Sequence, residues 1–512
     1  MMNEKWEEQF REQIHGFVET IEKFDKGEID RKAYKGISGG FGSYAQRDPS
    51  KHMLRLRMAG GNLTEKRLEF LAEAVKDYGV EFMKLTTCET VQLHNLKAEQ
   101  VPVLMEKAIA SEIYSRGGGG DNPRNIMMSP LSGVQKGEAF DVKPYAEAAA
   151  EYLLSIAGEI HMPRKLKVAF CNGADDSVHS AFRDMGFMAN PDGTFTLRIA
   201  GGLGGGYKMG VLVDEHVPAT EILYYIRAMI ETFCQHGNYE NRAKARTRFM
   251  QETLGVDGLK AAFLENVAKV KEKGGLDLHV EAKPVTKKGS GEISGKRVVA
   301  QKQPGLYAVA YHPIGGCLPA GKPAELLTLV REIPDAECRI APHETIYIIN
   351  LTADEAKKVL EATNDGAQST FENSVACIGA AICQQGVRDS QKALRAAVEA
   401  VREAKIPDGA LPKICISGCP SSCSGHQAAA LGFQGAAKTV DGKPESAFKM
   451  FVGGSDKLGA AKFGEAGAVI LERDLPKFFV ELGKAVASRN MNWETWIAGH
   501  EDEFKAIVEK YA

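Results

Sequence analysis

Hydrophobic and polar positions of this chain fall into two patterns that follow each other in a fixed order. β-rich runs that end in a glycine pair occur at residues 52–61, "HMLRLRMAGG", and 305–316, "GLYAVAYHPIGG". In both places a helix-like segment, a second β-rich run and another helical segment follow, the last being "AEQVPVLMEKAIA" or "ADEAKKVLEAT". This alternation predicts an α/β (α+β) chain in which mixed sheets carry helices.

The two regions resemble each other residue by residue. The segments "KLTTCETVQLHNL" (84–96) and "RIAPHETIYIINL" (339–351) align without a gap at an offset of 255 residues, so that Glu89 matches Glu344. The glycine pairs of the preceding β-rich runs match at the same offset. A shared offset over both runs favours an internal duplication over two chance β–α–β segments. It predicts a pseudo-twofold arrangement with something held between the halves.

A glycine-rich run, "RIAGGLGGGYKMGVLV" (198–213), lies between the two copies. Its glycines lead into a β-rich run, whereas a dinucleotide-binding loop opens a helix. We therefore expect a tight hairpin, or a place where backbone packs closely on a flat group. Residues 269–297 are polar and rich in Gly and Lys, which predicts a linker.

Composition narrows the class of protein. The chain has 512 residues, a net charge of −3 and ten cysteines. A net charge of −3 means that the protein has no overall positive charge that would attract nucleic acid. No apolar run is long enough to span a membrane. The N-terminus, "MMNEKWEEQFREQI", lacks the apolar core of a signal peptide. We therefore expect a cytoplasmic protein whose cysteines are metal ligands or buried residues, not disulfides.

Four cysteines form two short clusters. Cys377 and Cys383 occur in "ACIGAAIC", and Cys419 and Cys423 occur in "SGCPSSC". Pro420 suits the first position of a helix, which would make Cys419 the N-cap and place Cys423 one turn further on the same face. A helix N-terminus would also favour thiolate over thiol.

Three interpretations of these clusters stay open at this point. Four thiolates suit a 4Fe–4S cluster. Structural zinc is the second, although its ligand pairs are usually closer in sequence than the pair in "CIGAAIC". The third is burial without a metal, which is the better interpretation for the remaining cysteines that we weighed, Cys171, Cys234, Cys317, Cys338 and Cys415.

The paired motif "ACIGAAIC … SGCPSSC" resembles the cluster motif of the sirohaem-dependent sulfite and nitrite reductases. Further blocks are similar to that family in the family's order, and the offset of 255 residues matches its internal duplication. These blocks are "KHMLRLRMAGG", "KLTTCETVQLH", "DNPRNIMMSPLSGV", "MPRKLKVAF" and "GNYENRAKARTRF". The resemblance covers most of the chain and is most like the ferredoxin-type sulfite reductases.

The resemblance implies a 4Fe–4S cluster and a sirohaem, with roles for particular residues. Cys423 is implied to bridge cluster and sirohaem iron. The implied anion pocket is basic, and Lys165 and Lys167 stand two apart, so that on a strand they share a face. The implied cluster ligands are Cys377, Cys383, Cys419 and Cys423; the pocket residues are Arg55, Arg124, Lys165 and Lys167; the sirohaem-binding residues are Lys84, Gln92, Arg242, Lys244, Arg246, Arg248 and Cys423.

The chain departs from the family pattern at two equivalent places. Cys88 and Glu89 stand where the family usually has an arginine followed by a glutamine. His343 and Glu344 stand in the family's amide-rich segment. A thiol cannot replace the charge of an arginine, so compensating cations are expected, the candidates being Lys84, Arg339 and His343.

The resemblance also implies a domain order. We expect an N-terminal extension (1–50), a ferredoxin-like half-domain (51–125), a sirohaem- and substrate-binding domain (126–297), a second ferredoxin-like half-domain (298–370) and a 4Fe–4S and sirohaem-binding domain (371–512).

The implied function is the six-electron reduction of sulfite to sulfide, with electrons from ferredoxin or another external donor. One alternative is nitrite reduction to ammonia, which is also a six-electron reaction. By resemblance, nitrite enzymes tend to have a neutral amide where this chain has Lys167, which favours sulfite. Another is an iron–sulfur electron-transfer protein without catalysis, an alternative motivated by Cys88 and Glu344. Neither nucleic acid nor a membrane is expected as a partner.

Overall fold

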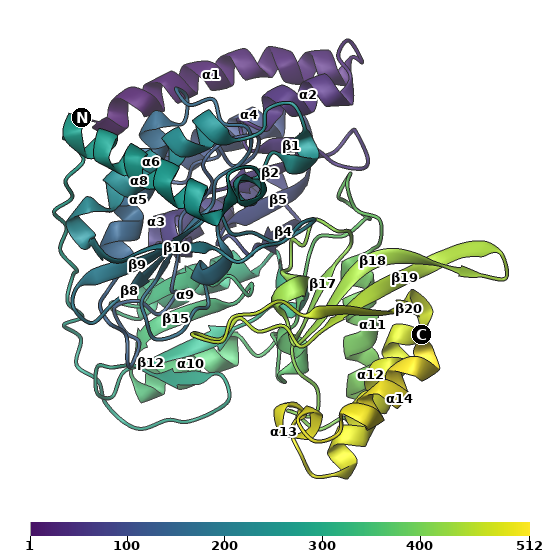
Figure 1. Cartoon of the computed structure of the whole chain (residues 1–512). Coiled ribbons are helices and arrows are strands. Elements are labelled where there is room, and N and C mark those ends of the chain that lie inside the picture. Colours follow the sequence, from purple (N-terminus) through teal and green to yellow (C-terminus); the bar gives the residue numbers. More distant parts are fainter. Residues whose placement is uncertain (1) are drawn as a thin grey trace.

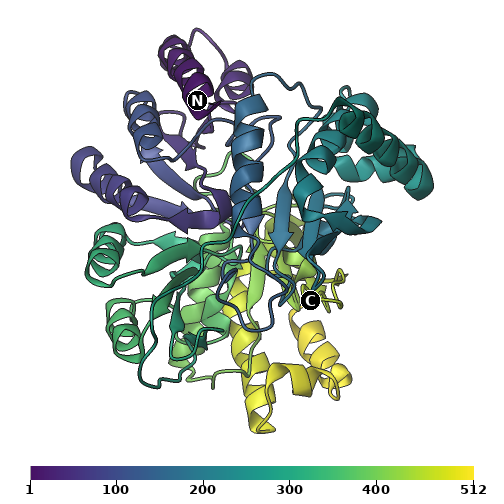
Figure 2. The same ribbon diagram turned by 90° about the vertical axis from the view of Figure 1, so that its left-hand side faces the viewer.

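The computed structural model describes residues 2–512. Within these residues the strands form four five-stranded sheets, and the helices lie toward the outside of the molecule (Figures 1 and 2). The predicted combination of helices and mixed sheets is confirmed. No helix of this part of the chain is long and apolar enough to cross a membrane.

The first repeat builds an antiparallel sheet with the strand order β1-β2-β5-β4-β13. Its strands are β1 (Ser43–Ala45), β2 (His52–Leu56), β4 (Phe82–Leu85), β5 (Val91–Leu96) and β13 (Cys317–Leu318). The second repeat builds the equivalent sheet, with the order β11-β12-β15-β14-β3. Its strands are β11 (Val298–Ala300), β12 (Tyr307–Tyr311), β14 (Glu337–Ile340), β15 (Ile346–Leu351) and β3 (Asn62–Leu63).

The predicted duplication is confirmed, because each strand of the second repeat begins 255 residues after its counterpart in the first. The repeats also exchange one strand each. β13 of the second repeat pairs with β4, where Cys317 lies opposite Lys84. β3 of the first repeat pairs with β14, where Asn62 lies opposite Arg339. These two pairings occupy equivalent positions and give the molecule its pseudo-twofold arrangement.

A glycine pair makes each strand exchange possible. It ends a short 3₁₀ turn, η1 (Ala59–Gly61) or η6 (Ile314–Gly316), directly before the exchanged strand. Gly61 has a φ of 64°, and a Cβ atom there would lie 2.5 Å from the carbonyl oxygen of Ile340. Only glycine tolerates both the left-handed backbone and the close approach of the partner repeat.

The other two sheets also share one topology. In each, two parallel pairings are followed by two antiparallel ones, in the orders β6-β7-β8-β9-β10 and β16-β17-β18-β19-β20. The strands are β6 (Met127–Met128), β7 (Val168–Cys171), β8 (Met185–Ala189), β9 (Thr194–Ile199), β10 (Val211–Pro218), β16 (Val375–Ala376), β17 (Ile414–Ser417), β18 (Leu431–Val440), β19 (Lys443–Val452) and β20 (Glu465–Leu471). The duplication therefore extends beyond the two segments whose sequences align.

Helices cover the sheets and carry ordinary capping signals. The Thr64 hydroxyl caps α3 (Glu65–Tyr78), whose C-cap residue Gly79 has a left-handed backbone. Thr352 and Glu355 form a capping box on α10 (Ala353–Ala362). α3 and its counterpart α9 pack together across the two repeats. The helices are α1 (Met2–Asp25), α2 (Arg31–Ser38), α3 (Glu65–Tyr78), α4 (Gln100–Ala110), α5 (Lys143–Ile156), α6 (Ile222–His236), α7 (Met250–Thr253), α8 (Gly255–Lys273), α9 (Lys322–Glu332), α10 (Ala353–Ala362), α11 (Ser390–Glu403), α12 (Leu475–Ser488), α13 (Trp493–Ile497) and α14 (Glu501–Tyr511).

The predicted linker is shorter than expected. Residues 269–273 belong to the end of α8, and residues 274–297 run without helix or strand to β11. The glycine-rich run at 198–213 forms the expected hairpin, closed by a bridge between Gly202 and Lys208. The five domain boundaries stay a prediction.

Candidate functional site

A cavity of ≈ 340 Å³ lies where the sheet of the first repeat faces the cysteine loops of the fourth sheet. The sheet turns one face to it because side chains alternate along a strand. Leu54 and Leu56 of β2 are fully buried in the core, so Met53, Arg55 and Arg57 point to the opposite face and line the cavity.

Three cavity residues lie in one row across this sheet. Arg55 is in register with Gln92 of β5, and Gln92 is in register with Lys84 of β4. With its amide oxygen toward Arg55, Gln92 accepts a hydrogen bond from Nε at 3.0 Å and donates one to Nε2 of His94 at 3.2 Å. His94 then donates from Nδ1 to the Gln46 side-chain oxygen at 3.1 Å. Burial, together with Arg55 and Lys84, lowers the pKa of His94 to about 3, so this histidine is neutral.

The two predicted pocket arginines are held by backbone carbonyl groups and not by carboxylates. Arg55 Nη1 donates to the carbonyl oxygen of Gly118 at 2.7 Å. Arg124 donates to the carbonyl oxygens of Gly118 at 3.0 Å and Gly120 at 2.7 Å. The glycine-rich loop before Arg124 thus orients both guanidinium groups while their charges stay available to a ligand.

Lys165 and Lys167 enter the cavity from the segment directly before β7. Leu166 between them is buried and bridges to Pro123, so the two lysines share the other side of the chain, as predicted. Burial and the cations Arg246 and Arg124 lower the pKa of Lys165 well below its usual range. Such an ammonium group gives up a proton more easily than an exposed one.

Cys88 also lines the cavity, at the position where an arginine was expected from the resemblance. Burial raises the pKa of its thiol, but the nearby charges of Lys167 and Arg183 outweigh burial and lower the pKa to about 7. The Cys88 thiolate raises the pKa of Lys167, whereas burial and Arg183 act in the opposite direction and leave it lowered. Thiol and ammonium group are therefore electrostatically coupled within the anion pocket.

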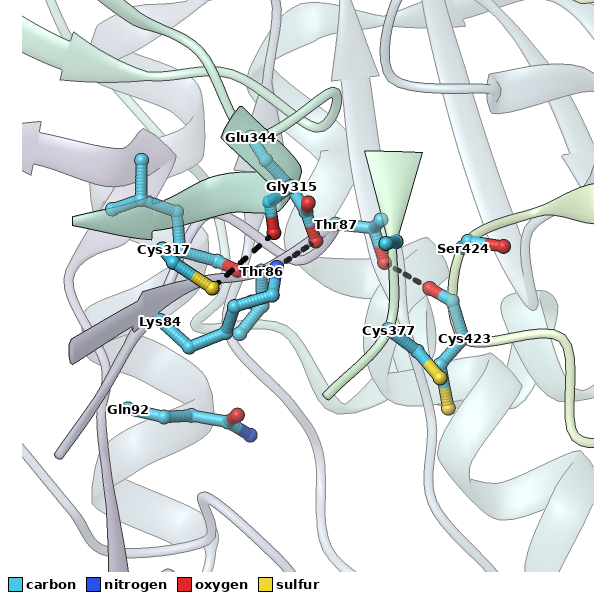
Figure 3. Close-up of polar contacts among 12 residues, drawn as sticks. Lys84, Thr86, Thr87, Gln92, Gly315, Cys317, Glu344, Cys377, Cys423 and Ser424 are labelled. Carbon is cyan, nitrogen blue, oxygen red and sulfur yellow. Dashed lines mark hydrogen bonds and ion pairs between the residues drawn. The ribbon is translucent and has the colours of Figure 1, made fainter. Parts of the chain in front are cut away.

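All four clustered cysteines line the same cavity. Cys377 Sγ accepts a hydrogen bond from the Gly418 amide at 3.1 Å and lies 3.1 Å from the Ser390 hydroxyl. Figure 3 shows the sulfur atoms of Cys377 and Cys423 on the same side of their loops, and Thr87 of the first repeat donates to the Cys423 carbonyl oxygen at 2.9 Å. In the described chain, no group of three or more His, Cys, Asp or Glu residues is arranged to hold a single metal ion.

The prediction that a helix begins at Cys419 is wrong. Residues 418–425 form bends and two short turns, Ser422 has a φ of 52°, and the next regular element is the 3₁₀ turn η8 (His426–Ala428). Pro420 is equally suited to a turn, because its fixed φ also fits the second turn position. The turn gives Cys419 and Cys423 no helix N-terminus of their own. Burial raises the pKa values of Cys377 and Cys383, so metal binding must displace their protons.

The residues present fit the two predicted cofactors. Four thiols face one cavity, and amide and hydroxyl groups are directed at Cys377 in the way that stabilises cluster thiolates. The cavity wall is strongly cationic and suits a tetrapyrrole with many carboxylates. Its basic residues are Lys35, Arg55, Arg57, Lys84, Arg124, Lys165 and Lys167, and Glu344 is the one acidic residue of this lining.

The predicted basic segment at 242–248 lies outside the cavity lining. Arg242 pairs with Asp121 at 2.5 Å, and Arg246 pairs with Asp184 at 2.8 Å. Lys244 lies 3.6 Å from Glu252. Arg248 donates to the carbonyl oxygens of the glycine-rich hairpin. The sirohaem-binding role of these four residues stays a prediction.

The compensating cations predicted for Cys88 behave differently from one another. Lys84 lines the cavity, whereas Arg339 and His343 do not. Arg339 turns away and pairs with Glu337 at 2.8 Å. Arg57 and Glu344 also line the cavity but were not predicted as site residues. Arg57 could have been found from its position two residues after Arg55 on the same strand face, and Glu344 from its match with Glu89 in the first repeat.

Comparison with known proteins agrees with this geometry. The model of the nitrite and sulphite reductase 4Fe-4S domain matches residues 119–271 and 367–487, and that of the nitrite/sulfite reductase ferredoxin-like half domain matches residues 44–111. The chain is 27% identical over 451 residues to a ferredoxin–nitrite reductase of Synechococcus elongatus, covering 85% of this chain and 86% of the relative. It is 27% identical over 425 residues to a chloroplastic ferredoxin–nitrite reductase of Arabidopsis thaliana, covering 79% and 71%.

A solved structure has the same fold. The Mycobacterium tuberculosis NirA protein superposes with a TM-score of 0.79 over 98% of this chain and 97% of that one, at 22% sequence identity. Together with the family models, this confirms the predicted fold class. The matches also confirm the resemblance derived from the cysteine motifs, and with it the 4Fe–4S cluster and the sirohaem.

Proposed function

Because the chain belongs to the nitrite and sulphite reductase family, we propose that this oxidoreductase reduces sulfite to sulfide in a six-electron reaction. The four clustered cysteines would hold the cluster, and the two cofactors, when bound, would pass electrons from the external donor to the substrate. The observation that carries the choice of sulfite is the position of Lys165 and Lys167, which enter the cavity from one side together. A second ammonium group favours an anion that carries up to two charges.

The basic residues of the cavity supply the other requirements of the reaction. Arg55 and Arg124 are oriented by the loop that contains Gly118, so they can hold anionic oxygens without first breaking an ion pair. Lys165 and Lys167, whose pKa values are lowered, can hand protons to oxygen as it leaves. Fixed cations of this kind stabilise the charge that develops on departing oxygen.

Nitrite is the second candidate substrate. The chain's relatives from Synechococcus elongatus and Arabidopsis thaliana are named ferredoxin–nitrite reductases. The Cys88 thiolate beside Lys167 also partly offsets the positive charge of the Lys167 ammonium group. This lessens the advantage that a second cation gives to sulfite over nitrite. The names of these two relatives support ferredoxin as the external donor. A cytoplasmic location remains an expectation from the sequence.

Steady-state kinetics with both anions test the proposal. The purified, cofactor-loaded protein is supplied with reduced ferredoxin, or with reduced methyl viologen as an artificial donor. We expect a larger kcat/KM for sulfite than for nitrite and stoichiometric sulfide as product. A larger kcat/KM for nitrite, with ammonia as product, would establish the alternative. A visible spectrum without the intense Soret band of a tetrapyrrole would instead favour an electron-transfer protein.

A further inference from the structure

Glu344 is an unusual group in the wall of an anion-binding cavity. It comes from the turn between β14 and β15 of the second repeat and reaches the cavity face of the first repeat. Its counterpart Glu89 has the same kind of left-handed backbone, with φ values of 54° for Glu89 and 63° for Glu344, and is also buried. Glu89 does not line the cavity, so the pair offers a matched comparison.

The carboxyl group of Glu344 is only half satisfied. Oε1 forms a buried ion pair with the Lys84 ammonium group (Figure 3), whereas Oε2 is buried without a hydrogen-bond partner among the described residues. An ionised carboxylate with one oxygen left unpaired in the interior is costly. Burial raises the pKa of Glu344 to about 7, although Lys84 acts in the opposite direction.

The other titratable groups that face Glu344 carry no charge near neutral pH. They are the thiols of Cys317 on β13 and Cys415 on β17. Burial raises the pKa of Cys317, and burial raises the pKa of Cys415 to about 12. Lys84 is therefore the charged neighbour that opposes the protonation of Glu344, which burial favours.

A polycarboxylate ligand changes this balance. Its negative charges disfavour a carboxylate beside them, which favours the protonated acid. A protonated carboxyl group donates one hydrogen bond and accepts others, as a side-chain amide does. This explains how an acid can stand in the segment that resembles the amide-rich one of the family.

The change also releases a cation. Cys88 leaves the cavity without the positive charge expected at that position, and Lys84 is the compensating candidate that lines the wall. While Glu344 is ionised, the Lys84 ammonium group is already neutralised by the ion pair. Once Glu344 carries a proton, the charge of Lys84 is available to the ligand.

We propose that Glu344 is protonated when the cavity holds sirohaem, that its hydroxyl donates a hydrogen bond to a carboxylate of the tetrapyrrole, and that Lys84 then pairs with the bound anion. The inference rests on the sirohaem binding that underlies the proposed function. Loading of the cavity is thus coupled to the uptake of one proton.

Retention of sirohaem as a function of pH tests this coupling in the holoenzyme. Wild-type protein, Glu344→Gln and the matched control Glu89→Gln are dialysed between pH 6 and pH 9.5, and bound sirohaem is measured by its Soret absorbance. Between the pKa values of the free and the loaded states, proton-coupled binding weakens by about tenfold per pH unit. We expect this loss in wild type and in Glu89→Gln but not in Glu344→Gln, which keeps the donor at every pH.

Infrared spectroscopy of the same samples gives a second readout. Burial raises the pKa of Glu89 well above its usual range as well, so each of the two acids is expected to give its own C=O stretching band. Glu344→Gln should remove one such band from the spectrum of the loaded wild-type protein, and Glu89→Gln should keep that band and lose the other. Equal pH dependence of wild type and Glu344→Gln, or loss of sirohaem from Glu344→Gln at pH 6, overturns the proposal. If the loaded protein shows the expected behaviour but reduces neither anion, the proposed function fails while this inference stands.

Discussion

The Thr87 hydroxyl of the first repeat donates a hydrogen bond of 2.9 Å to the backbone carbonyl of Cys423, which lies 336 residues further along the chain. The bond joins the sheet that carries the basic cavity face to the loop that carries the last cysteine. We predict that Thr87→Val lowers the free energy of unfolding by about 1 kcal/mol and alters the visible spectrum of the bound cofactors. Thermal unfolding and visible spectroscopy measure both effects. Thr87→Ser keeps the hydroxyl and is the control, so it should resemble wild type in both measurements.

Cys423 and Cys415 are predicted to differ sharply as cofactor ligands. Cys423 lines the cavity with the other three clustered cysteines, whereas Cys415 lies on β17 outside the lining. Serine is a poorer ligand for iron than a cysteine thiolate. Cys423→Ser should therefore lose tetrapyrrole absorbance together with iron and acid-labile sulfide, while Cys415→Ser retains them. Metal analysis that finds the same content in both variants would contradict the assignment.

Lys167→Asn should shift the choice between the two anions. The substitution keeps a hydrogen-bond donor and removes one charge, so sulfite turnover should fall and the nitrite-to-sulfite ratio of kcat/KM should rise roughly tenfold, the equivalent of about 1.4 kcal/mol. Lys413 directly precedes β17 as Lys167 directly precedes β7, but it lies outside the cavity. Lys413→Asn is the matched control. An unchanged ratio in Lys167→Asn would show that this charge does not select the substrate.

The ion pairs of Glu337 should stabilise the fold fully above about pH 4.5 and lose this effect as the pH falls toward 2. Burial raises its pKa, but Arg339 at 2.8 Å and Lys143 at 3.1 Å outweigh burial and lower the pKa to about 2 from the ordinary value of 4.5. A lowered folded-state pKa stabilises the protein above pH 4.5, and this contribution disappears as the pH falls toward 2. Glu337→Gln should therefore melt below wild type at pH 7, and the difference should shrink at pH 3. A difference in melting temperature that is the same at both pH values would argue against the ion pairs.

The strand exchange should be sensitive to a single methyl group. Gly61→Ala combines a left-handed backbone with a Cβ atom 2.5 Å from the Ile340 carbonyl oxygen. Gly275 has a φ of 81° with nothing within 4 Å, so Gly275→Ala measures the backbone strain alone. We expect Gly61→Ala to be less stable than Gly275→Ala by about 1–3 kcal/mol, measured by chemical denaturation. Similar stabilities would mean that the repeats separate slightly at this crossing.

Long periodic segments made most of the fold predictable. The strands around Leu54 and Leu93 alternate core and cavity residues, and the copies of these strands appear at the same offset in the sequence. The exchanged strands β3 and β13 could not be predicted, because two residues carry no period. Which sheet they join is decided by contacts with the partner repeat.

The site was predictable where residue type and spacing were both informative. The four cysteines, Arg55 and the two lysines, which the resemblance singled out, line one cavity, and their roles as ligands and pocket residues stay a prediction. The helix at Cys419 was predicted wrongly because Pro420 fits a turn as well as a helix start, and local sequence does not reveal the positive φ of Ser422. Glu344 was noted as a departure from the family's amide-rich segment, but its place in the cavity could not be predicted, because its turn belongs to one repeat and the cavity face to the other.

The exchange of β3 and β13 makes each repeat dependent on the other. Without β13, the sheet of the first repeat would end at β4, whose free amide and carbonyl groups would form an exposed edge of the kind that promotes aggregation. The same holds for β14 without β3. A chain divided within residues 274–297 therefore has to be produced as two pieces in the same compartment, since either piece alone displays an open sheet edge that the missing piece normally closes.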